Sequence, residues 1–368
     1  MTVTNSKLFS PVKIGSVQLK HRVVMAPLTR VRASDQAVPG DLAIEYYSQR
    51  ASDGGLIITE AAYIADEARG MATAPGLYTK EQLSQWTKIA DAVHAKGGKI
   101  FAQLWAAGRT ADPKVVGKVF GPSKDTYEGT EVNEMSEADI ARYVEHYKQA
   151  AINSVAAGLD GVEIHGANGY LQSPSNKRTD SYGGSIENRF RFPLQVLNAV
   201  CEAIGADKVG IRTAPFTQFQ GMREADPLSV FVPWTKAIIK AQPGLAYIHA
   251  VTGRDGITTE HHQADTLDPI RDALSGSGVQ FLIAGSFNPE TAKQQAQSTD
   301  DLVVFGRYFI STPDLPYRIA NDLPINKYNR DTFYTQGPVG YTDYPEWSES
   351  LKKDTLVDFK KDEVEHFK

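Results

Sequence analysis

Residues 159–170 read Leu159-Asp160-Gly161-Val162-Glu163-Ile164-His165-Gly166-Ala167-Asn168-Gly169-Tyr170. The first half is an apolar run typical of a buried strand, and the second half is a glycine-containing loop. His165 and Asn168 carry N–H donors that can hold one electronegative oxygen between them, and Tyr170 offers a weakly acidic phenol. This stretch is therefore either a small active site at a strand end or a turn whose polar side chains cap the backbone. The rest of the chain decides between these interpretations.

Similar short runs of Val, Ile and Leu recur along the chain and alternate with longer segments of helical period. The expected strands cover residues 23–27, 55–59, 99–104, 161–165, 209–213, 246–249, 280–284 and 302–305. Expected helices include residues 80–95, 136–157, 185–204 and 227–240. Eight such units predict a (β/α)8 TIM barrel. A doubly wound open sheet is the rival, but no Gly-x-Gly-x-x-Gly motif follows an early strand.

The two ends of the chain add to this barrel. Residues 11–20 alternate around a Gly-Ser turn, which predicts an N-terminal β-hairpin that caps the bottom of the barrel. Residues 348–368 are dense in Lys, Asp and Glu, which is typical of a solvated appendage. We therefore expect one barrel domain over residues 1–345 and a charged tail over residues 346–368.

Composition narrows the class of protein. The chain has 368 residues and a formal net charge of −5, and no run of Lys and Arg stands out, so a nucleic-acid partner is not expected. The polar start, residues 1–6, lacks a signal core, and no stretch of about 18 apolar residues exists. We expect a cytoplasmic protein with no membrane partner. Its one cysteine, Cys201, cannot form an internal disulfide and is expected to be buried and inert.

Polar groups follow several of the expected strands, on the face where barrel enzymes work. Gly285 and Gly306, with Arg307, supply backbone N–H groups and a guanidinium that suit a cofactor phosphate. Other strand-end residues could line one planar, hydrogen-bonding ring system: Thr29, Gln103 and Arg212. Each of these three also has an ordinary structural explanation, such as a turn cap, a backbone contact or, for Arg212, an ion pair with Glu163.

A metal site is not expected. His249, His261 and His262 are candidate ligands by residue type, but no carboxylate lies at ligand spacing with them, and a histidine pair in a loop is usually solvated.

Several motifs together resemble the Old Yellow Enzyme family of flavin-dependent ene-reductases, and the resemblance runs from Leu8 to about Tyr344. The residues that carry it are Ala26-Pro27-Leu28-Thr29-Arg30, residues 45–50, residues 102–105, residues 165–170, residues 178–189, residues 305–308 and residues 340–345. The resemblance implies a barrel that binds FMN non-covalently. It also implies an oxidoreductase, an NADPH dehydrogenase or ene-reductase, acting alone or as a homodimer on small activated alkenes.

The resemblance also implies individual roles. Thr29 would contact the flavin carbonyl O4, Ala62 and Gln103 the ring edge, and Arg212 the region of N1. The remaining cofactor contacts would come from Pro27, Gly285, Ser286, Gly306 and Arg307. The substrate pocket would be formed by His165, Asn168, Trp105, Met71, Phe219 and Tyr334.

These roles imply a ping-pong reaction in which NADPH first reduces the flavin and an unsaturated carbonyl or nitro compound is then reduced in the same site. His165 and Asn168 would bind the substrate oxygen as negative charge grows on it. Tyr170 would donate the proton from the opposite side, so that the two hydrogens add trans.

Two departures from the family pattern concern the substrate pocket. Only Gln172, Ser173 and Pro174 stand between Leu171 and Ser175, where the family carries several more residues, so the loop after Tyr170 is short. Met71 stands where relatives often have an aromatic residue.

Two alternatives remain open on the sequence. One is an isomerase or biosynthetic enzyme on the same flavin barrel, against which the presence of Tyr170 argues. The other is a flavin-free barrel enzyme, for which the expected Schiff-base lysine or paired carboxylates at the strand ends are missing.

Overall fold

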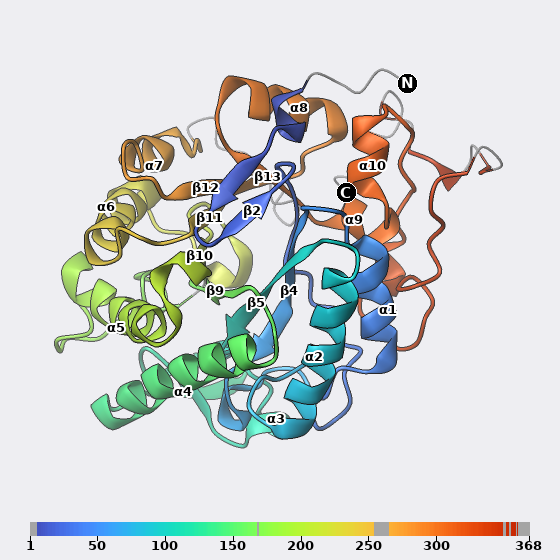
Figure 1. The fold of residues 1–368 in the computed structure, drawn as a ribbon. Helices are drawn as coiled ribbons and strands as arrows, with labels where there is room; N and C mark the ends of the chain where they lie inside the picture. Colours follow the sequence, from blue (N-terminus) through green and yellow to red (C-terminus); the bar gives the residue numbers. More distant parts are fainter. Residues whose placement is uncertain are drawn as a thin grey trace.

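A computed structural model describes residues 6–167, 169–253, 265–348, 351–352, 355–357 and 359. Eight parallel strands close into a barrel in the order β10-β11-β12-β13-β3-β4-β5-β9 (Figure 1). They are β3 (Val23–Met25), β4 (Leu56–Tyr63), β5 (Lys99–Trp105), β9 (Gly161–His165), β10 (Val209–Thr213), β11 (Tyr247–Val251), β12 (Gln280–Ala284) and β13 (Leu302–Phe305). The ring confirms the predicted (β/α)8 barrel, and its closure rules out the open doubly wound sheet.

Helices surround this ring (Figure 1). They are α1 (Asp41–Arg50), α2 (Lys80–His94), α3 (Pro113–Val116), α4 (Glu137–Ala156), α5 (Ile186–Ile204), α6 (Pro227–Ala241), α7 (Asp268–Ala273), α8 (Pro289–Ser298), α9 (Arg307–Ser311) and α10 (Leu315–Ala320). Short 3₁₀ turns lie at Lys7–Phe9, Asp66–Ala68, Gly108–Thr110, Ala206–Lys208, Phe219–Gly221 and Arg330–Thr332. The four predicted helices are confirmed, and local sequence explains where they begin. Thr79 and Ser136 form capping boxes with Gln82 and Asp139.

A hairpin closes the amino-terminal end of the barrel, as the sequence predicts. Strands β1 (Val12–Ile14) and β2 (Val17–Leu19) pair antiparallel, and their buried side chains join those inside the strand ring. The turn approaches the barrel closely, because Ser16 N donates to Asp207 O at 2.9 Å. A Cβ on Gly15, whose φ is +50°, would lie 1.9 Å from that same oxygen, so this turn requires glycine.

Between β5 and α4 the chain forms a small sheet that the sequence analysis did not predict. It consists of β6 (Val119–Gly121), β7 (Asp125–Tyr127) and β8 (Thr130–Glu134) in the order β6-β8-β7. Val119 and Val132 pack this sheet against Tyr63 and Ala107. The strands have only three to five residues, and much of β7 is exposed, so hydrophobic alternation is too weak to reveal them.

The beginning of the C-terminal tail packs against the barrel instead of forming only a solvated appendage. Trp347 N donates to Asp314 Oδ2 at 2.8 Å, and Val357 N donates to Ile325 O at 2.9 Å. Val357 is buried. A few apolar residues among the charges therefore dock this part of the tail.

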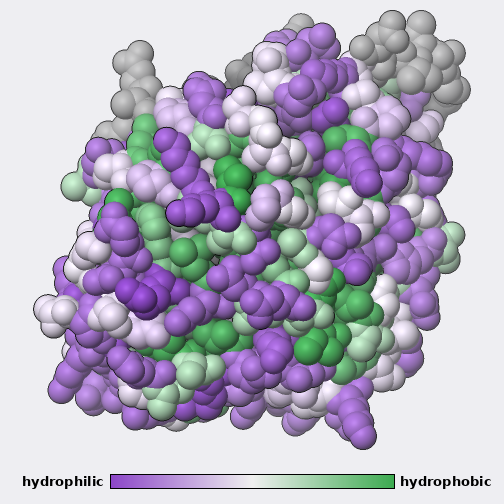
Figure 2. Space-filling model, turned by 60° about the vertical axis from the view of Figure 1, so that its left-hand side comes forward, coloured by the Kyte–Doolittle hydropathy of each residue, from purple (hydrophilic) through white to green (hydrophobic). Residues whose placement is uncertain are grey.

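Figure 2 shows hydrophobic side chains reaching the surface in patches between hydrophilic ones. Within the described residues, no helix is both long and apolar enough to cross a membrane. Cys201 is buried, as expected, and burial raises the pKa of its thiol to about 12.

Candidate active site

The predicted site residues lie at the carboxyl ends of neighbouring strands. His165 ends β9 and is paired in register with Arg212 on β10. Gln103 on β5 lies opposite Glu163 on β9. In strand order, the ends of β12, β13, β3, β4, β5, β9 and β10 carry Gly285, Gly306, Thr29, Ala62, Gln103, His165 and Arg212. Closure of the barrel thus gathers them on one rim.

A fully buried polar cluster lies beside this rim. Glu163 accepts a hydrogen bond from Gln103 Nε2 at 2.7 Å, and His249 Nδ1 lies 2.9 Å from its other carboxylate oxygen. Burial alone would raise the pKa of Glu163, but His249, the charge of Arg212 and the Gln103 hydrogen bond hold it below its ordinary value. Gln103 therefore contacts a carboxylate and not the backbone group considered as its ordinary partner.

His249 is a member of this cluster that sequence reasoning placed wrongly. It was considered only as a metal ligand without a nearby carboxylate, yet Glu163 lies against it. The signal was present in the alternation of the two strands, which turns Glu163 and His249 toward the barrel interior. Within the described ranges, no group of three or more His, Cys, Asp or Glu residues could hold a metal. His261 and His262 lie outside the described residues.

The His165 ring faces Trp105, with the ring centroids 6.1 Å apart. Burial, together with the positive charge of Arg212, lowers the pKa of His165 to about 4. The imidazole is therefore neutral at neutral pH and can donate one N–H hydrogen bond to a neutral oxygen. Its predicted partner Asn168 lies outside the described residues.

Tyr170 lies in an apolar environment. Its ring packs on Phe192 of α5, with centroids 4.5 Å apart, and only 8% of the residue is exposed. Burial raises the pKa of its hydroxyl, which has no hydrogen-bond partner among the described residues. The phenol is therefore held in its protonated form.

The short loop after Tyr170 is held by a buried ion pair. Glu224 accepts hydrogen bonds from Ser173 N at 2.6 Å and Ser173 Oγ at 2.7 Å, and it pairs with Arg189 at 2.6 Å. Arg189 also donates to Leu171 O. Gln172 Nε2 donates to Met222 O at 3.0 Å. These contacts fix the loop against residues 222–224, the segment that follows Phe219.

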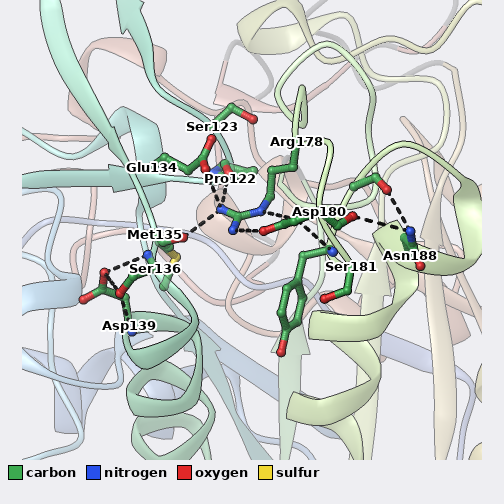
Figure 3. Close-up of polar contacts among 12 residues, drawn as sticks. Pro122, Ser123, Glu134, Met135, Ser136, Asp139, Arg178, Asp180, Ser181 and Asn188 are labelled. Carbon is green, nitrogen blue, oxygen red and sulfur yellow. Dashed lines mark hydrogen bonds and ion pairs between the residues drawn. The ribbon is translucent and has the colours of Figure 1, made fainter.

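The segment after this loop is tied to the small sheet by Arg178, which belongs to the motif at residues 178–189 (Figure 3). Its guanidinium donates to Pro122 O at 2.9 Å and Met135 O at 2.7 Å, and it pairs with Asp180. Asn188 of α5 donates to Gly183 O at 3.1 Å. Arg178, whose role the sequence did not reveal, thus anchors the residues that directly follow β6 and β8 to the segment before α5.

The predicted phosphate-binding residues come together after β12 and β13. Arg307 Nη2 donates to Ser286 Oγ at 3.1 Å, which joins the two strand ends. Gly285 packs so closely that a Cβ would lie 1.8 Å from Thr252 Oγ1. Two guanidinium groups, Arg307 here and Arg212 on β10, give the rim a donor set that fits an anionic, hydrogen-bonding cofactor such as FMN.

The remaining residues predicted to contact the cofactor or the substrate differ in burial. Pro27 and Thr29 are half-buried, and Ala62 is fully buried. Trp105 stacks on Tyr63, whose hydroxyl accepts from Met71 N at 2.7 Å. Three of the residues predicted to line the substrate pocket have exposed side chains, namely Met71, Phe219 and Tyr334.

Buried arginines fix the segment that carries Tyr334. Arg30 donates to Phe333 O at 3.0 Å and to Gly340 O at 2.7 Å, and Arg32 donates to Gly337 O at 2.8 Å. Arg30 lies one residue after Thr29. The first strand end and the C-terminal segment are therefore held as one unit.

Comparisons with known proteins identify the family of this chain. The sequence model of the NADH:flavin oxidoreductase / NADH oxidase family matches residues 7–326. A chanoclavine-I aldehyde reductase of Penicillium roqueforti is 44% identical over 357 residues, covering 92% of this chain and 96% of that protein. An NADP-dependent oxidoreductase of Aspergillus flavus is 42% identical over 364 residues, with 92% and 96% covered. The structure of an old yellow enzyme homologue from Zymomonas mobilis matches with a TM-score of 0.87 at 36% identity, covering 92% of this chain and 99% of that one. This chain therefore belongs to the Old Yellow Enzyme family of FMN-dependent oxidoreductases.

Proposed function

We propose that this protein reduces the activated C=C bond of α,β-unsaturated carbonyl or nitro compounds by a ping-pong reaction with NADPH. The observation that supports this most directly is the neutral His165 beside Arg212 at the end of β9. A neutral imidazole still carries one N–H group, so it can donate a hydrogen bond to a substrate oxygen on which negative charge develops.

Bound FMN would supply the hydride chemistry. Thr29, Ala62, Gln103 and Arg212 would contact its ring, with Pro27 alongside. Gly285, Ser286, Gly306 and Arg307 would hold its phosphate.

The chain's own residues then divide the remaining tasks. His165, together with Asn168, binds the substrate oxygen and stabilises the charge that develops on it. Tyr170 is the proposed proton donor, and its buried, protonated phenol suits a general acid. Trp105, Met71, Phe219 and Tyr334 line the substrate pocket, and the exposure of the last three favours an open entrance.

We also propose that the protein acts in the cytoplasm as a monomer or homodimer. NADPH is the proposed reductant because the Aspergillus flavus relative is named NADP-dependent, although the name of the family model mentions NADH.

The test uses the purified protein under anaerobic conditions. A flavin absorbance band is expected, NADPH should bleach it faster than NADH, and cyclohexenone or a nitroalkene should restore it. A colourless protein would contradict the cofactor assignment. A reduced flavin that dioxygen reoxidises but none of a panel of activated alkenes does would contradict the proposed substrate class.

A further inference from the structure

Glu163 is a buried acid that the proposed reaction does not use. Its side chain is completely inaccessible to solvent and lies inside the strand ring, against Gln103 and His249. A cluster of apolar side chains, among them Phe101, Leu282 and Val304, packs in the barrel interior, as in most barrels of this kind. A buried carboxylate lowers stability unless its partners compensate for the lost hydration. Packing alone therefore does not account for an acid at this position.

Two strands on opposite sides of β9 hold the carboxylate in place. Gln103 of β5 donates from Nε2 to one oxygen at 2.7 Å, and His249 Nδ1 of β11 lies 2.9 Å from the other oxygen. A carboxylate only accepts hydrogen bonds, so both neighbours turn an N–H group toward it. The carboxylate cannot rotate without breaking one of these two bonds, and its negative charge is therefore fixed in space.

Arg212 lies close to this fixed charge. Glu163 pairs in register with Gly210 on β10, and Arg212 follows two residues later on the same strand. Residues two apart on a strand point to the same face, so Arg212 points into the barrel one layer nearer the rim than Glu163. Although burial raises the pKa of Glu163, His249 and Arg212 hold it below its ordinary value. The same attraction acts in reverse, so Glu163 offsets part of the charge of Arg212.

The other titratable groups described around this pair are uncharged at neutral pH. Burial lowers the pKa of His249 although Glu163 lies against it, and burial together with Arg212 lowers the pKa of His165 to about 4. Burial also holds the pKa of Tyr247 well above its ordinary value. Without Glu163, these groups would leave the charge of Arg212 without its buried counter-charge.

A charge close to a flavin ring tunes its reduction potential, because reduction adds negative charge to the ring. In the proposed function, Arg212 contacts this ring. We propose that Glu163 is a positioning residue that acts through Arg212 and lowers the reduction potential of bound FMN, while Gln103 and His249 hold it in place. This inference rests on the proposed contact between Arg212 and FMN.

The test is the reduction potential of the FMN-loaded protein, measured anaerobically against a reference dye at neutral pH. Glu163→Gln removes the charge but keeps the side-chain length and an oxygen that can accept from Gln103. Reduced FMN should then bind about tenfold more tightly relative to oxidised FMN, which raises the potential by about 30 mV for a two-electron couple. Glu163→Met also lacks the charge and should raise the potential too, so the test does not depend on the folding of one variant.

Two control variants separate the charge from other effects of substitution. Glu163→Asp retains the charge and should keep the potential close to that of the wild type. Glu224→Gln makes the same chemical change in another buried carboxylate, which pairs with Arg189 of α5. Because that ion pair lies outside the strand ring, the potential should not change.

A potential that rises in neither uncharged variant would overturn this inference and leave the proposed cofactor and substrate class standing. A rise of the same size in Glu163→Asp or Glu224→Gln would also overturn it, since the shift would then not report the Glu163 charge. A wild-type protein that binds no flavin would overturn the cofactor assignment, and this inference with it.

Discussion

Glu163 and His165 lie two residues apart on β9, so their side chains share one face of the strand. Glu163 is completely buried and carries a negative charge close to Arg212, which keeps that cation compensated at the rim. His165 lies two residues nearer the strand end, and burial together with the charge of the same Arg212 lowers its pKa. His249 and Arg212 thus keep the carboxylate charged, and burial together with Arg212 keeps the imidazole neutral.

This arrangement leads to a prediction for His165→Ala. Loss of a preorganised donor to the substrate oxygen should slow reoxidation of the reduced protein by cyclohexenone about 10²-fold or more. Reoxidation by dioxygen should continue near its original rate, since that acceptor needs no carbonyl donor. Stopped-flow measurement of flavin absorbance with each acceptor checks this. Equal slowing with both acceptors would instead point to damage at the cofactor site.

At the scale of elements, the connection from β9 to α5 depends on one carboxylate. Glu224 accepts from both donors of Ser173 and pairs with Arg189, and each partner of the ion pair is only 8% exposed. Burial of such a pair adds little net stability, but removal of one partner leaves a buried, unpaired charge. Here the charge left behind would be that of Arg189, whose guanidinium also donates to Leu171 O at the base of the loop after Tyr170.

Glu224→Ala should therefore lower the free energy of unfolding by about 3–5 kcal/mol. Ser173→Ala, which removes one hydroxyl and leaves the ion pair intact, should cost only about 1 kcal/mol. Urea denaturation followed by tryptophan fluorescence measures both. Similar small losses in the two variants would show that the Arg189 charge finds another partner or reaches water.

The barrel strands could be predicted more easily than the small sheet, and the reason is physical. The barrel strands are continuous apolar runs buried on both faces, so the sequence displays them strongly. β4 nevertheless runs four residues past its expected end, because a bulge between Ile58 and Ala61 lets a polar pair, Thr59 and Glu60, lie within the strand. Strands β6 to β8 could not be predicted, since they are short and partly exposed, and Arg178, which holds the residues that follow β6 and β8, lies far along the chain.

In the candidate site, too, some features could be predicted from the sequence and others could not. The carboxyl-terminal ends of the strands followed from the barrel, so the gathering of Gln103, His165 and Arg212 on one rim was predictable. The partners of these residues were not. His249 comes from a strand 84 residues beyond His165, and only closure of the barrel brings it against Glu163.

At the scale of the whole molecule, two buried titratable groups respond to pH in opposite directions. His21 precedes β3 at the floor of the barrel, and burial lowers its pKa to about 4. Glu60 lies within β4, and burial raises its pKa to about 7 although Arg30 N donates to its carboxylate at 3.0 Å. Their effects on folding therefore fall in overlapping pH ranges with opposite sign.

The sign for each group follows from which state binds more protons. Unfolded His21 takes up a proton near pH 6.5 and folded His21 only near pH 4, so its contribution is complete above pH 6.5 and lost as the pH falls toward 4. Folded Glu60 keeps its proton up to about pH 7 and unfolded Glu60 only to pH 4.5, so its contribution is complete below pH 4.5 and lost as the pH rises through 7. The two effects oppose each other between pH 4.5 and 6.5.

Two single variants should separate these effects. His21→Asn keeps an acceptor for Val23 N, which donates to His21 Nδ1 at 3.2 Å, but it cannot take up a proton. Its unfolding free energy should therefore fall less than that of the wild type between pH 6.5 and 4, by on the order of 3 kcal/mol for a pKa shift of this size. Glu60→Gln should instead flatten the loss between pH 4.5 and 7. Urea midpoints from pH 4 to 8 for the three proteins decide the matter, since parallel profiles would mean that neither group titrates differently on folding. His165, whose pKa is lowered in the same direction, accounts for the acid-side loss that should persist in His21→Asn.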